Sequence, residues 1–257
     1  MSGAFHVASV GLEAQQRALD IIASNIANVN TPAYKRSQVH FSELLANGAD
    51  PAMIRADLGA SILGTAGVEA NGEVMLDEPG RIESTGRPLD LAIDGRGFIE
   101  LLGPDGQAML WRGGALKVNE DGLLSTAAGM PLKAAITIPD DAQGLTIGSD
   151  GIVRAVLEAG ADPTEIGQLM LVRVEGPSAL QRLDGGLYRV EDATRVTDAR
   201  PGEDGVGLLV QGGVERSNVE LTNEMVQLML VQRAYAANAQ IVQAADQLMG
   251  IANGLKR

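Results

Sequence analysis

Each end of the chain carries an apolar stripe at alternating steps of three and four residues, the pattern that one face of a long helix presents. At the N-terminal end the stripe consists of Phe5, Ala8, Leu12, Gln15, Leu19, Ile22, Ile26 and Val29. At the C-terminal end it consists of Leu228, Val231, Tyr235, Asn238, Val242, Ala245, Met249 and Ala252. The heptad spacing predicts two long helices that pair as a coiled coil.

Local signals predict where these helices end and begin. Thr31 precedes Pro32, and a residue before proline is pushed out of the α region, so the first helix stops there. Ser217-Asn218-Val219-Glu220 has the form of a capping box, in which Ser217 accepts from the backbone and Glu220 reaches back.

Two interpretations of the stripes stay open. The helices either close the core of the domain itself, or they pair with each other and with other subunits. The second is favoured because the ends differ in composition from the middle. One polar residue in each stripe, Gln15 and Asn238, would then fix the register between packed helices; a tolerated imperfection is the alternative.

The middle of the chain has a different composition. The 257 residues have a net charge of −13, but residues 1–46 and 217–257 each carry three acidic and three basic groups. Residues 47–216 hold 28 of the 32 glycines and nine of the ten prolines. Asp-Gly occurs there six times, at Asp94, Asp105, Asp121, Asp150, Asp184 and Asp204. Asp-Gly supplies the positive φ angles of tight turns and predicts short antiparallel strands in a barrel or sandwich.

The expected strands lie between these turns. They are Leu89–Ile93, Phe98–Leu102, Gln107–Trp111, Ala135–Ile138, Leu145–Ile147, Ile152–Leu157, Gln168–Val174, Leu187–Val190 and Gly207–Gln211. Residues 47–86 give weaker signals, with a short helix over Pro51–Leu58 and a loop over Gly59–Gly72. The sequence therefore predicts an α+β fold: long N- and C-terminal helices pairing as a coiled coil, and central, mainly antiparallel β structure of barrel or sandwich character.

Composition excludes several classes of function. The chain has no cysteine, so disulfides, thiolate metal sites and cysteine nucleophiles are absent. Two histidines and a pI near 4.6 argue against zinc chemistry and a nucleic-acid partner. No apolar run reaches membrane-spanning length, and no Sec signal is expected. We expect neither cofactor nor metal.

No motif indicates an enzyme. Gly95-Arg96-Gly97 lacks the third glycine and the following helix of a dinucleotide site, and a turn explains it. Asp140, Asp141 and Asp150 are not spaced as an EF-hand requires. His6 and His40 have no partner nearby in the sequence. We therefore predict no catalytic, cofactor-binding or metal residues.

Two segments resemble the signatures of bacterial flagellar rod and hook proteins. The first runs from Ala23 to Arg36, and its motif residues are Asn25, Asn28, Asn30, Thr31, Tyr34 and Lys35. The second runs from Gly212 to Tyr235, and its motif residues are Ser217, Asn218, Val219, Gln232, Arg233 and Tyr235. Within the family, Leu89–Gly97 and Ala135–Pro139 are most similar to the distal rod members.

The resemblance implies a structural protein, not an enzyme. Residues 1–35 with 218–257 would form the inner tube, 36–88 with 205–217 a connecting segment, and 89–204 an outer β domain. The seam residues Phe5, Leu12, Gln15, Leu19, Ile22, Ile26, Val29, Leu228, Val231, Tyr235, Asn238, Val242 and Met249 would lie between subunits. We also expect Asn25, Asn28 and Asn30 to hydrogen-bond the backbone at the helix end, and Tyr34 to fix the turn, so that truncating Tyr34 impairs polymerisation more than folding.

The resemblance further implies a helical homo-oligomer in the basal body that spans the periplasm. Its partners would be other rod subunits, the hook protein, surrounding ring proteins and the flagellar type III export apparatus. Residues 46–65 occupy the place of a stretch that stiffens the distal rod, but Ala46–Leu63 is not a close copy and is shorter. A proximal rod or hook-type member is therefore the alternative within the family, and an acidic secreted β module binding calcium or carbohydrate is the alternative outside it.

Overall fold

The computed structural model describes residues 2–44, 67–103, 107–157, 162–174, 180–190 and 196–254. The chain forms two compact units. The first takes in the described residues of Met1–Ala27, Ser37–Glu73 and Glu220–Arg257, and the second those of Asn28–Arg36 and Val74–Val219. No helix within the described ranges is both long and apolar enough to cross a membrane.

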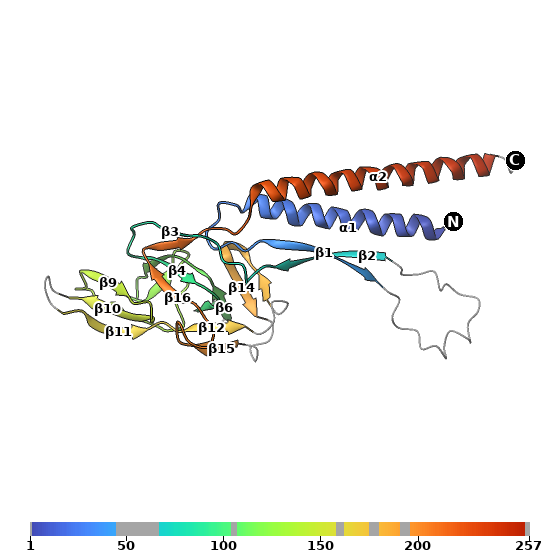
Figure 1. Cartoon of the computed structure of the whole chain (residues 1–257). Coiled ribbons are helices and arrows are strands. Elements are labelled where there is room, and N and C mark those ends of the chain that lie inside the picture. The colour runs from blue at the N-terminus through green and yellow to red at the C-terminus, as the bar shows by residue number, and fades with distance from the viewer. Residues whose placement is uncertain are drawn as a thin grey trace, which may run out of the picture. The chain divides into compact units, whose positions relative to one another are not determined.

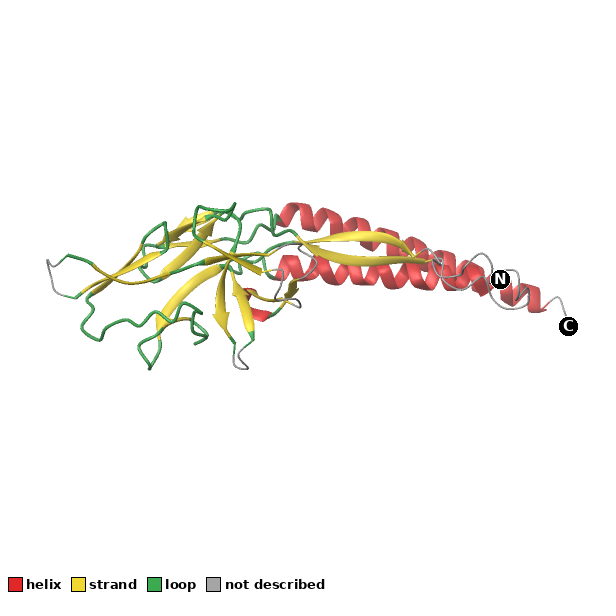
Figure 2. Cartoon of the chain, turned by 90° about the horizontal axis from the view of Figure 1, so that it is seen from below, coloured by secondary structure: helices red, strands yellow, loops and turns green. Residues whose placement is uncertain are grey.

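The first unit contains the two long helices, α1 (Ser2–Ala27) and α2 (Leu221–Gly254), and the strands β1 (Ser37–Leu44) and β2 (Gly67–Val74), which pair with each other. The helices lie side by side and run in opposite directions (Figures 1 and 2). The side chain of Asn25 bonds Glu224, while Gly11 lies against the amide of Asn238. The prediction of two long terminal helices is confirmed.

The buried face of α1 differs from the expected stripe. Among the side chains that the structure describes in α1, Ala14, Ala18, Ile22 and Asn25 are buried, and of these Ile22 alone belongs to the stripe. Two alanines are thus more deeply buried in the single chain than the leucines of the stripe, Leu12 and Leu19. The other described stripe residues of α1 are half-buried in the single chain, so the pairing of the two stripes as a coiled coil stays a prediction.

Two helix-end predictions are wrong. Helix α1 ends at Ala27, so Val29 lies in the turn beyond it. Helix α2 begins at Leu221, and the hydroxyl of Ser217 accepts from the N–H of Val219 at 3.3 Å. Ser217 thus closes a short turn before the helix instead of forming a capping box.

The second unit is built from four sheets. The six-stranded sheet has the order β13 (Leu180–Arg182), β14 (Leu187–Val190), β6 (Ala108–Trp111), β5 (Phe98–Leu102), β12 (Leu171–Val174), β15 (Val196–Ala199). The four-stranded sheet has the order β16 (Leu208–Gln211), β4 (Asp90–Asp94), β7 (Gly113–Val118), β8 (Leu124–Thr126). The three-stranded sheet has the order β11 (Thr164–Gln168), β10 (Ile152–Val156), β9 (Gly144–Ile147). The two-stranded sheet pairs β17 (Gly213–Glu215) with β3 (Ile82–Ser84). A short 3-10 helix spans Asp184–Gly186.

The α+β class with mostly antiparallel sheets is confirmed, but no sheet closes into a barrel in the described part of the chain. One hydrophobic core takes side chains from three of the sheets, among them Leu91, Ile99 and Val153. A second, smaller core contains Phe98, on the opposite face of β5 from Ile99. The six-stranded sheet is therefore covered on both faces at this strand.

The Asp-Gly turns adopt the expected backbone. Gly95, Gly122, Gly151, Gly185 and Gly205 all have positive φ angles, and the turn at Asp105-Gly106 lies outside the described residues. Three of these turns join strands that pair with each other: β7 with β8, β9 with β10, and β13 with β14. The turns at Gly95 and Gly205 instead connect strands of different sheets.

Some expected strands differ from the structure. Ala135–Ile138 forms only an isolated bridge through Thr137, because Ala135 has a φ angle of 46° that breaks an extended run. The expected loop over Gly59–Gly72 is wrong for its last residues, since Gly67–Gly72 belong to β2. Pro51–Leu58 and Ala46–Leu63 lie outside the described residues.

Candidate functional site

Asn25 holds three elements of the first unit together. Its Nδ2 donates to the carbonyl of Ser37 at 2.8 Å and to Oε2 of Glu224 at 3.0 Å, while its Oδ1 accepts from the N–H of Ser37 at 2.9 Å. Asn25 and Glu224 are both fully buried. One amide near the end of α1 thereby fixes the start of β1 and the first turns of α2, which we call the Asn25 cluster.

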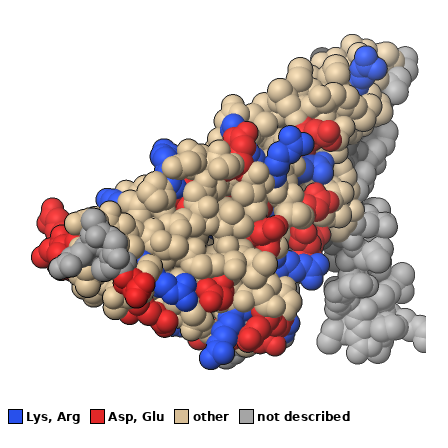
Figure 3. Space-filling model, turned by 60° about the vertical axis from the view of Figure 1, so that its left-hand side comes forward, with Lys and Arg blue, Asp and Glu red and all other residues tan. Residues whose placement is uncertain are grey.

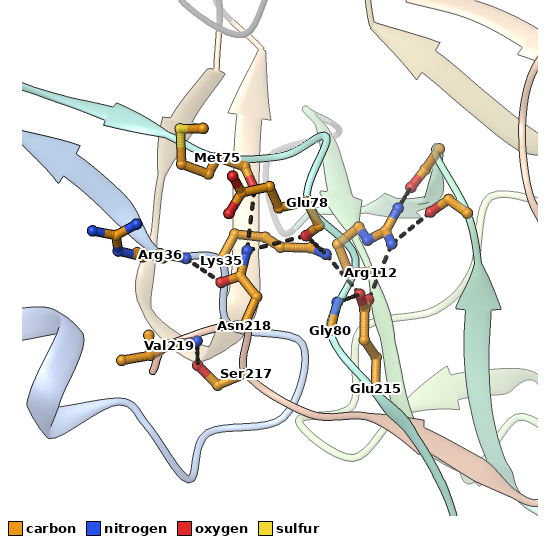
Figure 4. Close-up of polar contacts among 12 residues, drawn as sticks. Lys35, Arg36, Met75, Glu78, Gly80, Arg112, Glu215, Ser217, Asn218 and Val219 are labelled. Carbon is orange, nitrogen blue, oxygen red and sulfur yellow. Dashed lines mark hydrogen bonds and ion pairs between the residues drawn. The ribbon is translucent and has the colours of Figure 1, made fainter. Parts of the chain in front are cut away.

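A second buried polar cluster lies within the second unit, and Glu215 is at its centre (Figure 4). Lys35 Nζ donates to Oε1 of Glu215 at 2.6 Å and to the carbonyl of Glu78 at 2.9 Å. The N–H of Gly80 donates to the same Oε1 at 2.9 Å, and Nη2 of Arg112 donates to Oε2 at 3.0 Å. We call Lys35, Arg112 and Glu215 the Glu215 cluster. All three side chains are almost completely buried.

Arg112 is held rigidly in this cluster. Its Nη1 donates to the carbonyl of Gly97 at 2.6 Å and its Nη2 to that of Gly95 at 2.8 Å. The guanidinium carbon lies 5.7 Å from the centre of the Phe98 ring, close enough for a cation–π contact. The turn predicted at Gly95-Arg96-Gly97 therefore presents its carbonyl groups to a buried cation.

The cluster contains two cations and one carboxylate, which affects its titration. Burial, and next the Arg112 guanidinium, lower the pKa of Lys35 from its ordinary value, although Glu215 acts in the opposite direction. Burial raises the pKa of the neighbouring Tyr188 hydroxyl. Removing the carboxylate would leave two buried positive charges together, so Glu215 is the residue on which the cluster depends.

Asn218 joins both terminal motifs within the second unit (Figure 4). Its Oδ1 accepts from the N–H of Arg36 at 2.6 Å, and its Nδ2 donates to the carbonyls of Glu78 at 3.0 Å and Met75 at 3.4 Å. Its own N–H donates to the carbonyl of Tyr34 at 3.4 Å. Asn218 therefore binds the backbone of the N-terminal motif directly.

Tyr34 is buried, and the guanidinium carbon of Arg182 lies 4.3 Å from the centre of its ring. Arg182 also donates to the carbonyl of Lys35. Ala33, before the tyrosine, has a φ angle of 56° and donates its N–H to the carbonyl of Glu215 at 2.8 Å. The left-handed backbone is unfavourable for alanine, so these contacts fix a strained turn.

The remaining motif residues are less constrained. Thr31 Oγ1 donates to Oδ1 of Asn28 at 3.0 Å, while Asn30 is exposed. Val219 is buried, and Gln232 and Arg233 are exposed on α2.

The seam residues differ in how far the single chain buries them. Ile22 is buried, and Tyr235 is 39% exposed. Phe5 and Met249 lie in helices, but their side chains are outside the described part of the structure. The others are half-buried: Leu12, Gln15, Leu19, Ile26, Val29, Leu228, Val231, Asn238 and Val242.

Sequence reasoning missed several charged partners of the motif residues, among them Glu78, Glu215 and Glu224, and it missed Arg112, which binds Glu215. Glu215 and Glu224 stand inside the C-terminal motif, but charged residues are rarely fully buried, so nothing local marked them. A buried lysine requires a counter-charge, so a search for a carboxylate partner of Lys35 is the step that could have found Glu215.

Neither cluster brings together the side chains of a metal centre. Within the described residues, no three His, Asp or Glu side chains lie close enough to hold a metal ion. The Asp150 carboxylate accepts from the N–H of Ile152 at 3.1 Å, as expected of a turn residue. Each cluster joins a segment near the N-terminus to a segment near the C-terminus through buried hydrogen bonds.

Three protein-family models match the chain. Residues 5–35 match the family of flagella basal body rod proteins, residues 92–155 match the D1 domain of the flagellar hook proteins FlgE, FlgF and FlgG, and residues 210–255 match the C-terminal region of flagellar basal body rod FlgE/F/G proteins. The first and third of these regions contain the motif residues that meet in the two clusters.

The chain is similar to known proteins over its full length. It is 33% identical to the flagellar basal-body rod protein FlgG of Caulobacter vibrioides, over 98% of this chain and 99% of that protein. It is 33% identical to FlgG of Borreliella burgdorferi over 100% of both chains. Identity to FlgF of Caulobacter vibrioides is 31% over 93% of both. These matches favour the rod family over an acidic module binding calcium or carbohydrate.

Proposed function

The chain belongs to the flagellar basal-body rod protein family, and on that premise we propose that it is a structural subunit of the rod, most like FlgG. It polymerises into a helical drive shaft that transmits torque from the motor to the hook and encloses the export channel. It works as a building element and not as an enzyme, and needs no cofactor.

One observation carries this proposal: α2 has large apolar side chains on its exposed side as well as on its half-buried side. Leu228, Val231 and Val242 lie on the side that is half-buried in the single chain. On the other side, large apolar side chains remain about half exposed or more: Met225, Val226, Met229, Leu230, Ile241 and Ile251. Many large apolar side chains exposed along one helix mark an interaction surface, so α2 is suited to pack against neighbouring subunits.

The predicted tube follows from this packing. Its inner wall is formed by residues 1–35 with 218–257, and the outward-facing β domain by residues 89–204. The segment that connects the two consists of residues 36–88 with 205–217. Neighbouring subunits then cover the part of the α1 stripe that the single chain leaves exposed, including parts of Leu12, Leu19 and Ile26. The helices carry few charges, which lets many copies pack closely without strong repulsion.

The proposed location is the rod in the periplasm, reached through the flagellar type III export apparatus. Its partners are further copies of the chain, other rod subunits and the hook protein at its ends, and the ring proteins that surround the rod. FlgF-like proximal rod assembly is the alternative within the family.

Charge placed on the exposed side of α2 tests the proposal. Met229→Asp and Leu230→Asp should abolish swimming and remove the chain from purified basal bodies, because a carboxylate cannot be buried unpaired between helices. The stability of the monomer should change by less than about 0.5 kcal/mol, since both positions are exposed there.

Gln16→Asp is the matched control, because it adds the same charge at an exposed polar position of α1. This variant should assemble normally. If Met229→Asp assembles at the normal level, the proposed packing of α2 is wrong. If the wild-type chain itself is absent from purified basal bodies, the proposed function is wrong.

A further inference from the structure

A cavity of about 240 Å³ opens within the second unit beside the Glu215 cluster. Its apolar wall comes from residues of the smaller core, with Phe98, Val174 and Leu180 among them. The charged residues that line it are three arginines and one carboxylate, Arg96, Arg112, Arg173 and Asp77. Three arginines thus line one cavity in a chain whose net charge is −13.

The rim of the cavity is accessible and charged. Arg96 Nε lies 2.9 Å from Oδ1 of Asp77, and both side chains are about two-thirds exposed. Arg173 is exposed, and its Nη1 donates to the carbonyl of Asp204 at 3.2 Å. An exposed ion pair is weak, so the Arg96 guanidinium is available to a second carboxylate.

The floor of the cavity contains the buried guanidinium of Arg112. Arg112 shares Glu215 with Lys35, so one carboxylate serves two buried cations. The Nε of Arg112 is buried without a hydrogen-bond partner among the described residues. Charge interactions are stronger beside an apolar wall than in open water, so an anion entering the cavity would be attracted.

The size and chemistry of the cavity indicate the occupant. Cavities that hold small-molecule ligands are usually larger, from about 300 Å³ upward. A carboxylate side chain fits the smaller volume, and arginine binds carboxylates through two parallel hydrogen bonds. Acidic turn residues of this chain, such as Asp140 and Asp141, are exposed. Figure 3 shows acidic side chains standing at the surface of one face, interspersed with basic ones.

We infer that this cavity binds an acidic side chain of a second copy of the chain. The identity of the occupant rests on the proposed function, because polymerisation holds many copies at high local concentration. The contact would add a directional, charge-assisted attachment between subunits, separate from the apolar packing of the helices.

The first part of the experiment tests the cavity in the full chain at concentrations where it is monomeric. Succinate, a dicarboxylate, is titrated at constant ionic strength while backbone amide resonances are followed by NMR. The Gly97, Phe98 and Val174 resonances should shift and saturate, and neutral succinamide should leave them unchanged. Arg96→Gln and Arg173→Gln should each weaken binding about tenfold, the loss of one charge-assisted contact. Arg200→Gln, exposed and outside the cavity lining, should bind as wild type.

The second part tests the occupant by measuring the critical concentration for polymerisation. Arg96→Gln and Arg173→Gln should raise it about tenfold relative to Arg200→Gln. Failure of succinate to shift the cavity resonances overturns the site. Succinate binding combined with unchanged polymerisation of both variants overturns the second copy as occupant, and neither result depends on whether the chain is found in the rod.

Discussion

Lys35 and Glu215 form a buried ion pair of 2.6 Å although 180 residues separate them in the chain. Lys35 belongs to the N-terminal motif, and Glu215 stands just before the Ser217-Asn218-Val219 part of the C-terminal one. This ion pair is one of the contacts that bring the two family motifs together within the second unit.

Glu215→Gln should destabilise the monomer strongly. The change leaves the charges of Lys35 and Arg112 buried without a counter-ion, which costs about 3–5 kcal/mol. Urea unfolding measures the loss. Glu83→Gln is the control, because Glu83 forms a 2.7 Å ion pair with Arg216 in which both side chains are about half exposed. The control should cost less than about 1 kcal/mol, and equal losses in the two variants would contradict the role given to Glu215.

Asn218→Ala should cost about 1–3 kcal/mol, because the backbone groups of Arg36, Glu78 and Met75 lose their side-chain partner. Asn30→Ala changes an asparagine of the N-terminal motif that is exposed, and its effect should stay within about 0.5 kcal/mol. Thermal unfolding of both variants measures the difference. A larger loss of stability in Asn30→Ala would contradict the structural role given to Asn218.

Tyr34→Ala should damage folding as well as assembly, which changes the expectation drawn from the sequence alone. The ring is buried against Arg182, so truncation should cost about 3–5 kcal/mol. Tyr34→Phe keeps the ring and should cost less than about 1.5 kcal/mol. Monomer unfolding and polymerisation are measured together, and a stable Tyr34→Ala monomer that fails only to polymerise would favour the original expectation.

Gln15→Leu should leave the stability of the monomer intact while it disturbs the register between packed subunits. The Oε1 of Gln15 is buried without a hydrogen-bond partner among the described residues, so its removal should leave the monomer unchanged or stabilise it by up to about 1 kcal/mol. If Gln15 sets the register between subunits, the variant should form polymers with less uniform helical order in electron micrographs. Unchanged order would remove the register hypothesis for Gln15, and Asn238→Leu tests it on α2.

Lys35 should make stability depend on pH in an unusual direction. Burial, followed by Arg112, lowers its pKa from the ordinary 10.5, so the unfolded chain binds more protons than the folded one as pH rises toward that value. The unfolding free energy of the wild type relative to Lys35→Met should therefore increase as the pH is raised from neutral toward the ordinary pKa of lysine. Staying below pH 10 avoids the titration of tyrosines in the unfolded chain. A difference that falls over this range would contradict the lowered pKa.

The sequence determined the parts of the fold that local signals specify. The apolar periodicity required helices at both ends, and each described Asp-Gly turn has the positive φ that this dipeptide favours. The motifs identified the family because their residues are distinctive without reference to any contact.

Only the tertiary structure decided which groups are buried and by what. Periodicity shows that a helix has an apolar face, but not that Ala14 and Ala18 are more deeply buried in the single chain than Leu12 and Leu19. Likewise, no local pattern distinguishes Glu215 from an exposed glutamate. Its burial depends on Lys35 and Arg112, which the fold brings to it from distant parts of the chain, and a charge stays buried only where such partners meet it.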